Sequence, residues 1–227
     1  MTSSTVRPGA RHILVAGGGI PGLALALALK QAHGPALAAT LCDPALASGG
    51  SRQRGRAYAV AAGARRMLER LGVWERLTGA AQPIHDMAIS DSRLADPVRP
   101  VFLTFGQDRE GEDPFAHMVE AEPLVEALLA GAREAGLVLD ARGVSGARPE
   151  GRAMRVTLSD GESLAASLVA ASDGARSRLR EAAGIGWVGR SYPQMGIVAT
   201  IGHARDHEGR AYEHFLPGGP FAILPLT

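Results

Sequence analysis

The sequence contains little of what several protein classes require. Cys42 is the one cysteine in 227 residues, so neither an intrachain disulfide nor a thiolate metal cluster can form within the chain, which suits a reducing compartment. The formal net charge is only +1 and the basic residues are scattered, so no field favours nucleic acid. With 46% hydrophobic and 21% charged residues, we expect a cytoplasmic globular protein that binds no nucleic acid.

Long apolar runs are also missing. The uninterrupted run from Leu23 to Leu29 is far shorter than the about 20 residues that span a bilayer, so no transmembrane segment is predicted. A signal peptide is the alternative, because two arginines precede this run and the segment at 36–39 looks cleavable. Three glycines and Pro21 interrupt the apolar region where a phosphate-binding turn needs them, which favours a mature domain.

One stretch organises the rest of the chain. The apolar segment 12–16 runs into Gly-x-Gly-x-x-Gly at Gly17, Gly19 and Gly22, and then into an Ala/Leu-rich segment. The first glycine permits a tight turn, the second lets phosphate approach the backbone, and the third lets the helix pack on the strand. About 20 residues later a second apolar strand ends in Asp43, where an acid can accept ribose hydroxyls. We predict a dinucleotide site, against the alternative of a chance glycine turn.

Periodicity and turn residues predict the remaining elements. Helices are expected over 23–29, 57–71 and 122–135, with a short helical turn at 73–77 and a further helix from Ala175. A small separate sheet is expected from 137–139, 154–158 and 163–164, with a hairpin turn at 159–161. Other strands are expected at 87–90, 101–105, 115–120, 168–171, 195–201, 211–216 and 221–226.

The histidines near the end of the chain raise the question of a metal site. His203 and His207 are four residues apart and His214 follows, but no helix is expected there on which they could converge. Turn and strand patterns place them at strand ends, so no metal site is predicted. Cys42 is interpreted as a small buried apolar residue and not as a nucleophile.

The motifs taken together resemble a known family. The glycine motif, Asp43, Arg56 and the stretch Asp173-Gly174-Ala-Arg-Ser177-Arg-Leu-Arg180 resemble the para-hydroxybenzoate-hydroxylase-like flavoprotein monooxygenases. Within that group the chain is most similar to the aromatic-ring hydroxylases of ubiquinone biosynthesis. The supporting stretches follow the family's order over nearly the whole chain: 56–77, 83–84, 89–91, 192–194, 207–215 and 219–226.

The resemblance implies a fold and a division into domains. The fold class is α/β, with a Rossmann-like FAD-binding domain built on a parallel sheet and a second, mostly antiparallel β substrate domain that is incomplete. The FAD-binding domain is expected over 1–80 and 107–185 and the partial substrate domain over 81–106 and 186–227.

The resemblance also implies site residues. Gly17, Gly19 and Gly22 would hold the FAD pyrophosphate, and Asp43 stands where the family has an acid on the adenosine ribose. Arg56 matches an arginine at the start of the second helix that meets the flavin's phosphate or ribityl side; the alternative is a solvated cation at a helix start. Asp173 and Gly174 match a motif near the pyrophosphate and the nicotinamide approach, or form an ordinary turn that caps the helix from Ala175.

The expected activity follows from the family. FAD, reduced by NAD(P)H as co-substrate, reacts with O2 and hydroxylates a small aromatic, prenylated ubiquinone precursor. The resemblance leaves open whether the protein is free in the cytoplasm, peripheral to the inner membrane or part of a biosynthetic complex. Two alternatives remain: a reductase of the same fold, and a non-catalytic fragment or assembly subunit.

One departure from the family concerns length. The family has a second flavin motif, similar to Gly-Asp-Ala-Ala-His, beyond the point where this sequence stops, and the sequence contains no such stretch. We therefore expect it to correspond to the N-terminal portion of a longer enzyme, with a C-terminal half missing. We also expect this polypeptide by itself to bind FAD weakly or not at all.

Overall fold

A four-stranded parallel sheet lies between two helices and a smaller antiparallel sheet. The computed structural model describes residues 11–50, 55–106 and 114–227. Residues 1–10, 51–54 and 107–113, which belong to the predicted FAD-binding domain over 1–80 and 107–185, lie outside the described residues. The sheet has the strand order β12-β1-β2-β8, and every neighbouring pair is parallel. Its strands are β1 (Arg11–Ala16), β2 (Leu37–Cys42), β8 (Val138–Asp140) and β12 (Leu168–Ala171).

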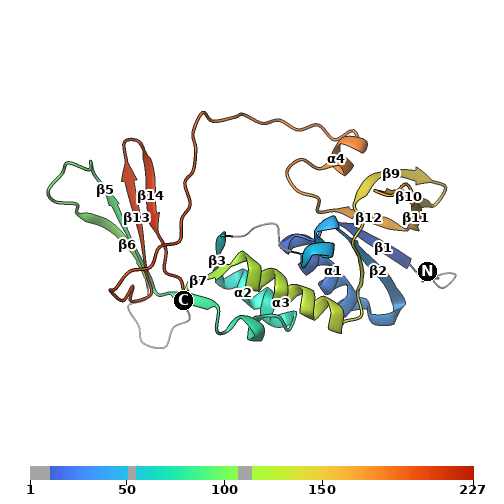
Figure 1. Cartoon of the computed structure of the whole chain (residues 1–227), viewed down its shortest axis with the longest axis horizontal. Helices are drawn as coiled ribbons and strands as arrows, with labels where there is room; N and C mark the ends of the chain where they lie inside the picture. Colours follow the sequence, from blue (N-terminus) through green and yellow to red (C-terminus); the bar gives the residue numbers. More distant parts are fainter. Residues whose placement is uncertain (1–10, 51–54, 107–113) are drawn as a thin grey trace.

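Two helices cover one face of this sheet (Figure 1). They are α1 (Ile20–His33), which follows the glycine turn, and α3 (Ala121–Glu134). Alternate residues of each strand, such as Val15 and Leu41, are fully buried against Leu23 and Leu27 of α1. The Ala/Leu composition favours helix, although Leu23–Leu29 also alternates like a strand, and the predicted helix is confirmed with wider bounds.

A three-stranded antiparallel sheet covers the other face. Its strands are β9 (Val144–Glu150), β10 (Ala153–Leu158) and β11 (Ser163–Ala166), in the order β11-β10-β9. The opposite side chains of the parallel sheet, Leu14 and Cys42 among them, pack against Val156 and Leu158 of β10. The parallel sheet is therefore buried on both faces, as parallel sheets usually are.

The prediction of this small sheet was partly wrong. The hairpin at Ser159–Gly161 is confirmed, because β10 pairs with β11 across it. The segment 137–139, however, contributes to β8 of the parallel sheet, and β9 was not predicted. A three-residue apolar run does not indicate which strand it pairs with. The segment that forms β9 contains Gly146 and Pro149, and because both residue types are uncommon within strands, no strand was predicted there.

A second three-stranded sheet follows, in the order β3-β7-β4, and it corrects another prediction. Its strands are β3 (Ala57–Ala61), β4 (Ala81–Ile84) and β7 (Ala116–Glu120). The helix predicted over 57–71 is in fact β3 followed by α2 (Ala62–Arg70). Pairing with β7 outweighs the helix propensity of the three alanines in β3. The short 3₁₀ helices are η1 (Gly34–Ala36), η2 (Pro44–Ser48) and η3 (Trp74–Leu77), the last of them close to the predicted turn at 73–77.

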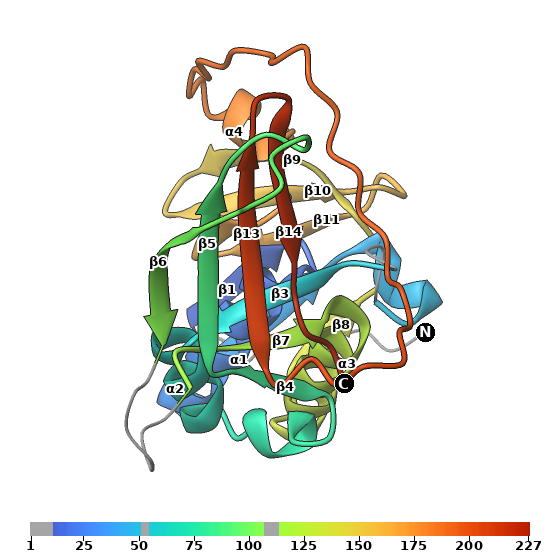
Figure 2. The same cartoon turned by 90° about the vertical axis from the view of Figure 1, so that its left-hand side faces the viewer.

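The fourth sheet stands at the far end of the molecule from β9–β11 (Figures 1 and 2). Its order is β14-β13-β5-β6, and all pairs except the parallel β5–β13 pair are antiparallel. Arg210 at the start of β13 donates through Nε and an Nη nitrogen to Asp86 of β5, at 2.6 and 2.9 Å. The strands are β5 (Asp86–Asp91), β6 (Val101–Gly106), β13 (Arg210–Leu216) and β14 (Gly219–Ile223).

The strand predicted at 195–201 is wrong. The chain leaves α4 (Arg178–Ala182) and crosses to β13 with no regular secondary structure from 185 to 203 (Figure 1). Met195 and Ile197 are each 91% exposed. A strand needs a partner for its backbone groups, and no described strand pairs with this segment. The parallel sheet with covering layers and the mostly antiparallel sheet agree with the predicted fold class, whereas the exact domain boundaries stay a prediction.

Candidate functional site

The glycine turn joins β1 to α1 in a conformation that only glycine tolerates. Gly17 has φ +111°, and a Cβ atom built on it would lie 2.2 Å from the backbone oxygen of Ser172. A Cβ atom on Gly22 would lie 1.9 Å from the backbone oxygen of Gly17. These two glycines therefore let β12, β1 and α1 approach one another closely, as expected from the motif.

Gly19 differs from its neighbours because the space beside it is open. The nearest atom to a Cβ built there would be Cδ of Pro21, at 3.8 Å. Gly19 is also the N-cap of α1, where no described side chain caps the helix and no acidic residue lies in the first turn. The helix N-terminus thus presents free backbone donors and a positive dipole end, which suit a phosphate group.

Asp43 directly follows β2 and ties the turn in place. Its Oδ2 accepts a hydrogen bond from the backbone N–H of Gly18 at 2.7 Å, and its Oδ1 accepts one from Ala45 N–H at 2.7 Å. The structure thus brings the predicted acid to the predicted turn. A carboxylate is the kind of acceptor that a ribose hydroxyl needs.

Asp173 follows β12 at the same edge of the sheet, and its side chain is hydrogen-bonded to the start of the next helix. Its carboxylate accepts hydrogen bonds from Ser177 Oγ at 2.5 Å and from the backbone N–H groups of Arg178 and Leu179 at 2.9 and 3.4 Å. The helix predicted from Ala175 begins at Arg178, with Ser177 as its N-cap. Asp173 therefore caps the start of α4, as the alternative interpretation predicted, and Ser177 is a second cap.

Arg56 lies elsewhere. It precedes β3 and not a helix, and its backbone oxygen accepts a hydrogen bond from Ala121 N–H at the start of α3, at 2.8 Å. Its side chain is exposed, and it does not line the pocket described below. The predicted position at a helix start is wrong, because 57–61 is a strand. Gly174, with φ +93° and open space around it, makes the turn after Asp173.

A pocket of about 330 Å³ opens where the parallel strands end. Ligands of open α/β sheets bind at this edge, which three backbone hydrogen bonds hold together: Gly17 N–H to Cys42 O, Ser172 N–H to Ala16 O and Asp43 N–H to Asp140 O. The pocket brings together Gly17, Asp43 and Asp173 from the predicted set. Its lining is Ala16, Gly17, Cys42, Asp43, Pro44, Gly143, Val144, Ser145, Ser159, Asp173, Arg176 and Arg178.

Reasoning from sequence predicted only Gly17, Asp43 and Asp173 of these lining residues. Gly143, Val144 and Ser145 follow β8, Ser159 comes from the β10–β11 turn, and two arginines precede or begin α4. Assigning 137–139 to the parallel sheet would have found the first three, because residues after parallel strands meet at one edge. Arg176 and Arg178 are exposed and supply positive charge at the pocket.

The remaining titratable groups near the pocket favour binding over acid–base chemistry. Burial, and to a lesser extent the charge of Asp140, raise the pKa of Cys42 to about 12, so its thiol is neutral and packs as an apolar group. Further away, His214 lies between the hydroxyls of Ser90 and Ser92, and His207 contacts the backbone of Leu226. Within 11–50, 55–106 and 114–227, no three His, Cys, Asp or Glu side chains are grouped so as to hold a metal ion.

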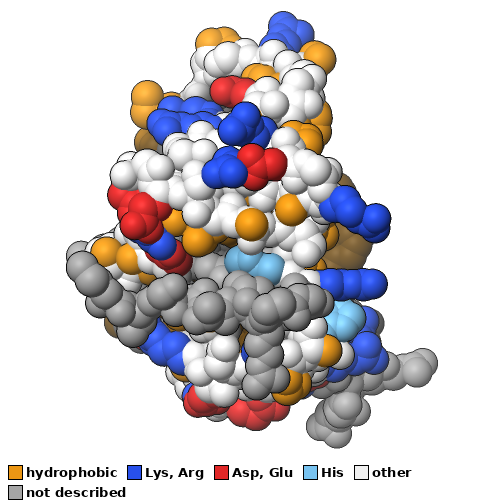
Figure 3. All heavy atoms as spheres, turned by 90° about the vertical axis from the view of Figure 1, so that its right-hand side faces the viewer, with side chains coloured by type: hydrophobic (Ala, Val, Ile, Leu, Met, Phe, Trp, Pro, Cys, Tyr) orange, Lys and Arg blue, Asp and Glu red, His pale blue; other side chains and the backbone are white. Residues whose placement is uncertain are grey.

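Two further properties concern the surface. No helix in the described part of the chain has the length and apolar character needed to cross a membrane. On the face that includes the β9–β11 end, basic and acidic side chains are interspersed (Figure 3).

Comparison with known proteins identifies the family. The model of the FAD binding domain family matches residues 11–220, which includes the glycine turn, the pocket and β13. The chain belongs to the FAD binding domain family. The resemblance found from the motifs is thereby confirmed.

The curated proteins that the chain resembles include hydroxylases named for ubiquinone or its precursors. The chain is 40% identical over 217 residues to ubiquinone hydroxylase UbiL of Rhodospirillum rubrum, an alignment that covers 94% of the chain and 49% of that protein. It is 31% identical to 3-demethoxyubiquinol 3-hydroxylase of Escherichia coli, covering 95% of the chain and 54% of that protein. The chain thus spans about half the length of the curated relatives it matches.

A solved structure supports the fold of this FAD binding domain. The tetrameric form of 2-methyl-3-hydroxypyridine-5-carboxylic acid oxygenase superimposes with a TM-score of 0.67 at 22% identity, over 96% of the chain and 56% of that protein. At this identity the similarity concerns the fold alone.

Proposed function

We propose that this chain is the nucleotide-binding half of an FAD-dependent monooxygenase that hydroxylates the aromatic ring of a ubiquinone precursor. The observation that carries the proposal is the Asp43–Gly18 hydrogen bond, which fixes the acid beside the open N-terminus of α1 and the pocket. The hydroxylase names of relatives at 40% and 31% identity support the reaction class.

The residues present fit the adenosine diphosphate part of FAD. Gly19 would admit the pyrophosphate to the helix N-terminus, because among the described residues the nearest atom to a Cβ built there is Pro21 Cδ, at 3.8 Å. Asp43 would accept a ribose hydroxyl, and the pocket beyond it would take the adenine between Pro44 and Val144. Arg56 is carried over from the family as a contact to the flavin's phosphate or ribityl side, and Asp173–Gly174 as a pyrophosphate contact.

The chemistry is supplied by the cofactor when it is bound: the flavin takes electrons from NAD(P)H and uses O2 to add one oxygen atom to the ring. The contribution of this chain is to bind and orient the nucleotide. No side chain at the pocket needs to move a proton for this role.

The expected substrate is a small aromatic ring with a prenyl chain. Such a molecule partitions into membranes, so a location at the periphery of the inner membrane, or in a biosynthetic complex, belongs to the proposal. A reductase of the same fold is the second candidate function, because the FAD site alone does not distinguish the two reactions.

The proposal is tested by oxygen uptake and product analysis with FAD, NADH and a prenylated phenol. The chain is assayed with and without a separately expressed C-terminal half of ubiquinone hydroxylase UbiL. We expect hydroxylated product only with both halves present. Reduction of the prenyl chain without oxygen uptake would favour the reductase, and no turnover with both halves would favour a non-catalytic fragment.

A further inference from the structure

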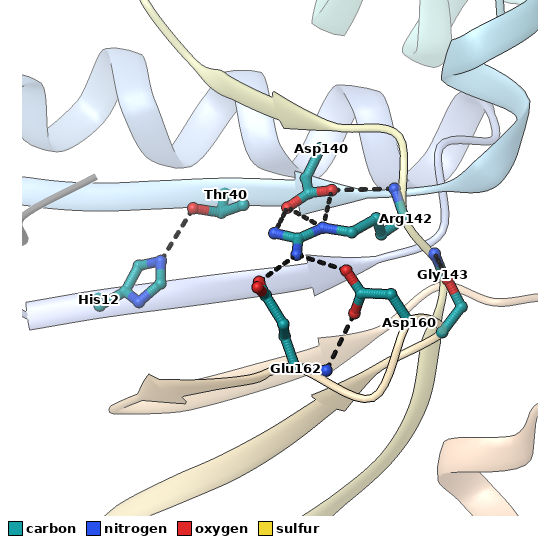
Figure 4. A network of polar contacts seen from close by, with 8 residues as sticks. His12, Thr40, Asp140, Arg142, Gly143, Asp160 and Glu162 are labelled. Carbon is teal, nitrogen blue, oxygen red and sulfur yellow. Dashed lines mark hydrogen bonds and ion pairs between the residues drawn. The ribbon is translucent and has the colours of Figure 1, made fainter. Parts of the chain in front are cut away.

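A cluster of charged side chains lies directly behind the pocket. Arg142, two residues after β8, pairs with three carboxylates, those of Asp140, Asp160 and Glu162 (Figure 4). Its Nε and Nη2 contact both oxygens of Asp140 at 2.7–3.2 Å, and its Nη1 contacts Asp160 Oδ2 at 2.8 Å and Glu162 Oε2 at 2.6 Å. We call these four residues the Arg142 clamp. It joins the end of β8 to the turn between β10 and β11.

The clamp is connected to Asp43 through the backbone. The backbone oxygen of Asp140 accepts a hydrogen bond from Asp43 N–H at 3.0 Å. The carboxylate of Asp43 in turn accepts the bond from Gly18 N–H in the glycine turn. A continuous chain of hydrogen bonds therefore runs from the β10–β11 turn through Arg142 and Asp140 to the proposed ribose acceptor and the turn.

The residues that directly follow Arg142 and precede Asp160 form one wall of the pocket. Gly143 and Ser159 exchange two hydrogen bonds, Ser159 N–H to Gly143 O at 2.8 Å and Gly143 N–H to Ser159 Oγ at 3.2 Å. A Cβ atom on Gly143 would lie 3.0 Å from Cγ of Pro44, so this wall packs tightly against the residue after Asp43. Gly143, Ser159 and Pro44 line the pocket, whereas Arg142 does not.

The charges of the clamp make Arg142 the residue whose removal should disturb the joint between β8 and the β10–β11 turn most. One guanidinium balances three carboxylates, of which Asp140 is the least exposed, at 16% of its side chain. Removing Arg142 would leave three like charges facing one another across the joint between β8 and the β10–β11 turn. Removing Asp160 or Glu162 would leave the other carboxylate still bound. An exposed ion pair by itself contributes little, but a fork-shaped guanidinium bound to several carboxylates fixes geometry.

We infer that Arg142 is a positioning residue for nucleotide binding, which sets Asp43 and the Gly143–Ser145 wall through the clamp without touching the ligand. This inference rests on the proposed function, because it concerns the adenosine end of the same site. ADP is the probe, since it carries only the part of FAD that this pocket would hold.

The test is a double-mutant cycle on ADP affinity with Arg142→Gln and Asp43→Asn. We expect Arg142→Gln to weaken ADP binding about tenfold and Arg142→Lys to recover part of the loss. Because part of the effect of Arg142 runs through Asp43, the double variant should bind ADP clearly more tightly than the product of the two single losses predicts. A merely structural role predicts that the two losses multiply, and that result would overturn the inference, as would wild-type affinity in Arg142→Gln.

Arg155→Gln is the matched control. Arg155 forms a comparable ion pair with Glu150 in the same three-stranded sheet, with Nε at 2.8 Å from Oε1, and this pair shares no residue with the Arg142 clamp. Its loss should change ADP affinity by less than about twofold. An equal loss in both arginine variants would mean that any ion pair in this sheet has the effect, and the inference would fail.

A readout without ligand separates this inference from the proposed function. In Arg142→Gln the amide hydrogens of Asp43 and Gly18 should exchange about tenfold faster than in the wild type, and in Arg155→Gln they should not. If Arg142→Gln does not fold, the Asp160→Asn/Glu162→Gln double variant takes its place. Unchanged exchange and unchanged ADP affinity refute the inference alone; absence of ADP binding by the wild type refutes the proposed function and the inference together.

Discussion

At the scale of single residues, the three glycines of the motif have different surroundings and different expected roles. Gly17 and Gly22 are confined by neighbouring backbone, and Gly19 faces open space. The sequence motif predicts a separate role for each glycine: tight turn, phosphate approach and helix packing. The close backbone contacts at Gly17 and Gly22 and the wider spacing at Gly19 agree with that division.

This separation predicts opposite phenotypes for two alanine substitutions. Gly22→Ala should lower the free energy of unfolding by about 3 kcal/mol, since its Cβ would lie 1.9 Å from Gly17 O. Gly19→Ala should cost less than about 1 kcal/mol but abolish detectable ADP binding, because the methyl group occupies the open space. Urea unfolding and ADP titration of both variants test this. Normal ADP binding by Gly19→Ala would show that phosphate does not approach there.

Cys42 gives a second prediction at this scale. Its thiol is 1% exposed and its pKa is raised to about 12 by burial, so on the order of one thiol in ten thousand is ionised at pH 8. The native protein should react with a disulfide reagent such as DTNB at least about a hundredfold more slowly than in denaturant. As the only cysteine, it gives a single signal. Native-state reaction at the rate of a free thiol would contradict its burial.

At the scale of elements, α4 depends on Asp173 as well as on Ser177. Asp173→Ala removes the acceptor for two backbone N–H groups and one hydroxyl, so it should destabilise the protein by about 1 kcal/mol. Glu181→Ala, an exposed position on the same helix, is the control and should have little effect. Thermal unfolding measures both. Unchanged stability combined with lost ADP binding would show that the carboxylate serves the ligand and not the helix.

The Arg142 clamp should make the free energy of unfolding depend on pH in the acidic range. Hydrogen bonds from Arg142 lower the pKa of Asp140, and the pKa of Asp160 is lowered by the same guanidinium. Groups with a depressed folded-state pKa stabilise the protein above their unfolded pKa, about 3.9, and that contribution is lost as pH falls through the folded-state value. The stability difference between wild type and Arg142→Gln should therefore be present at pH 7 and shrink below about pH 4. Urea unfolding at both pH values tests this, and a pH-independent difference would contradict it.

Elements with strong local patterns were predictable, and those defined by distant partners were not. The glycine turn, α1, α3 and the hairpin at 159–161 follow from local composition and turn residues. The sequence predicts a helix for 57–61, but this segment is a strand that pairs with β7. Nothing in the sequence of 137–139 indicates that the strand it forms pairs with β2. Residues 195–201 read as a strand, but strand pairing requires a partner that the described chain does not provide.

At the scale of the whole molecule, the sequence predicted those site residues that follow a strand it also predicted. Asp43 and Asp173 lie with Gly17 at the pocket, as the motifs suggested, because each follows a parallel strand. The wall formed by Gly143–Ser145 and Ser159 depends on β8 joining that sheet, which no local pattern indicated. Arg56 lies outside the pocket, so its predicted contact with the flavin rests on the family and on no contact in this structure.

The central claim is that this edge of the parallel sheet binds the adenosine end of FAD. The most direct measurement is an amide-resolved NMR titration of the chain with FAD, ADP and FMN, which detects weak binding. We predict that FAD and ADP shift the amide signals of Gly17–Gly19, Asp43 and Val144, and that FMN, which lacks adenosine, does not. Shifts confined to other residues, or equal shifts with FMN, would contradict the account.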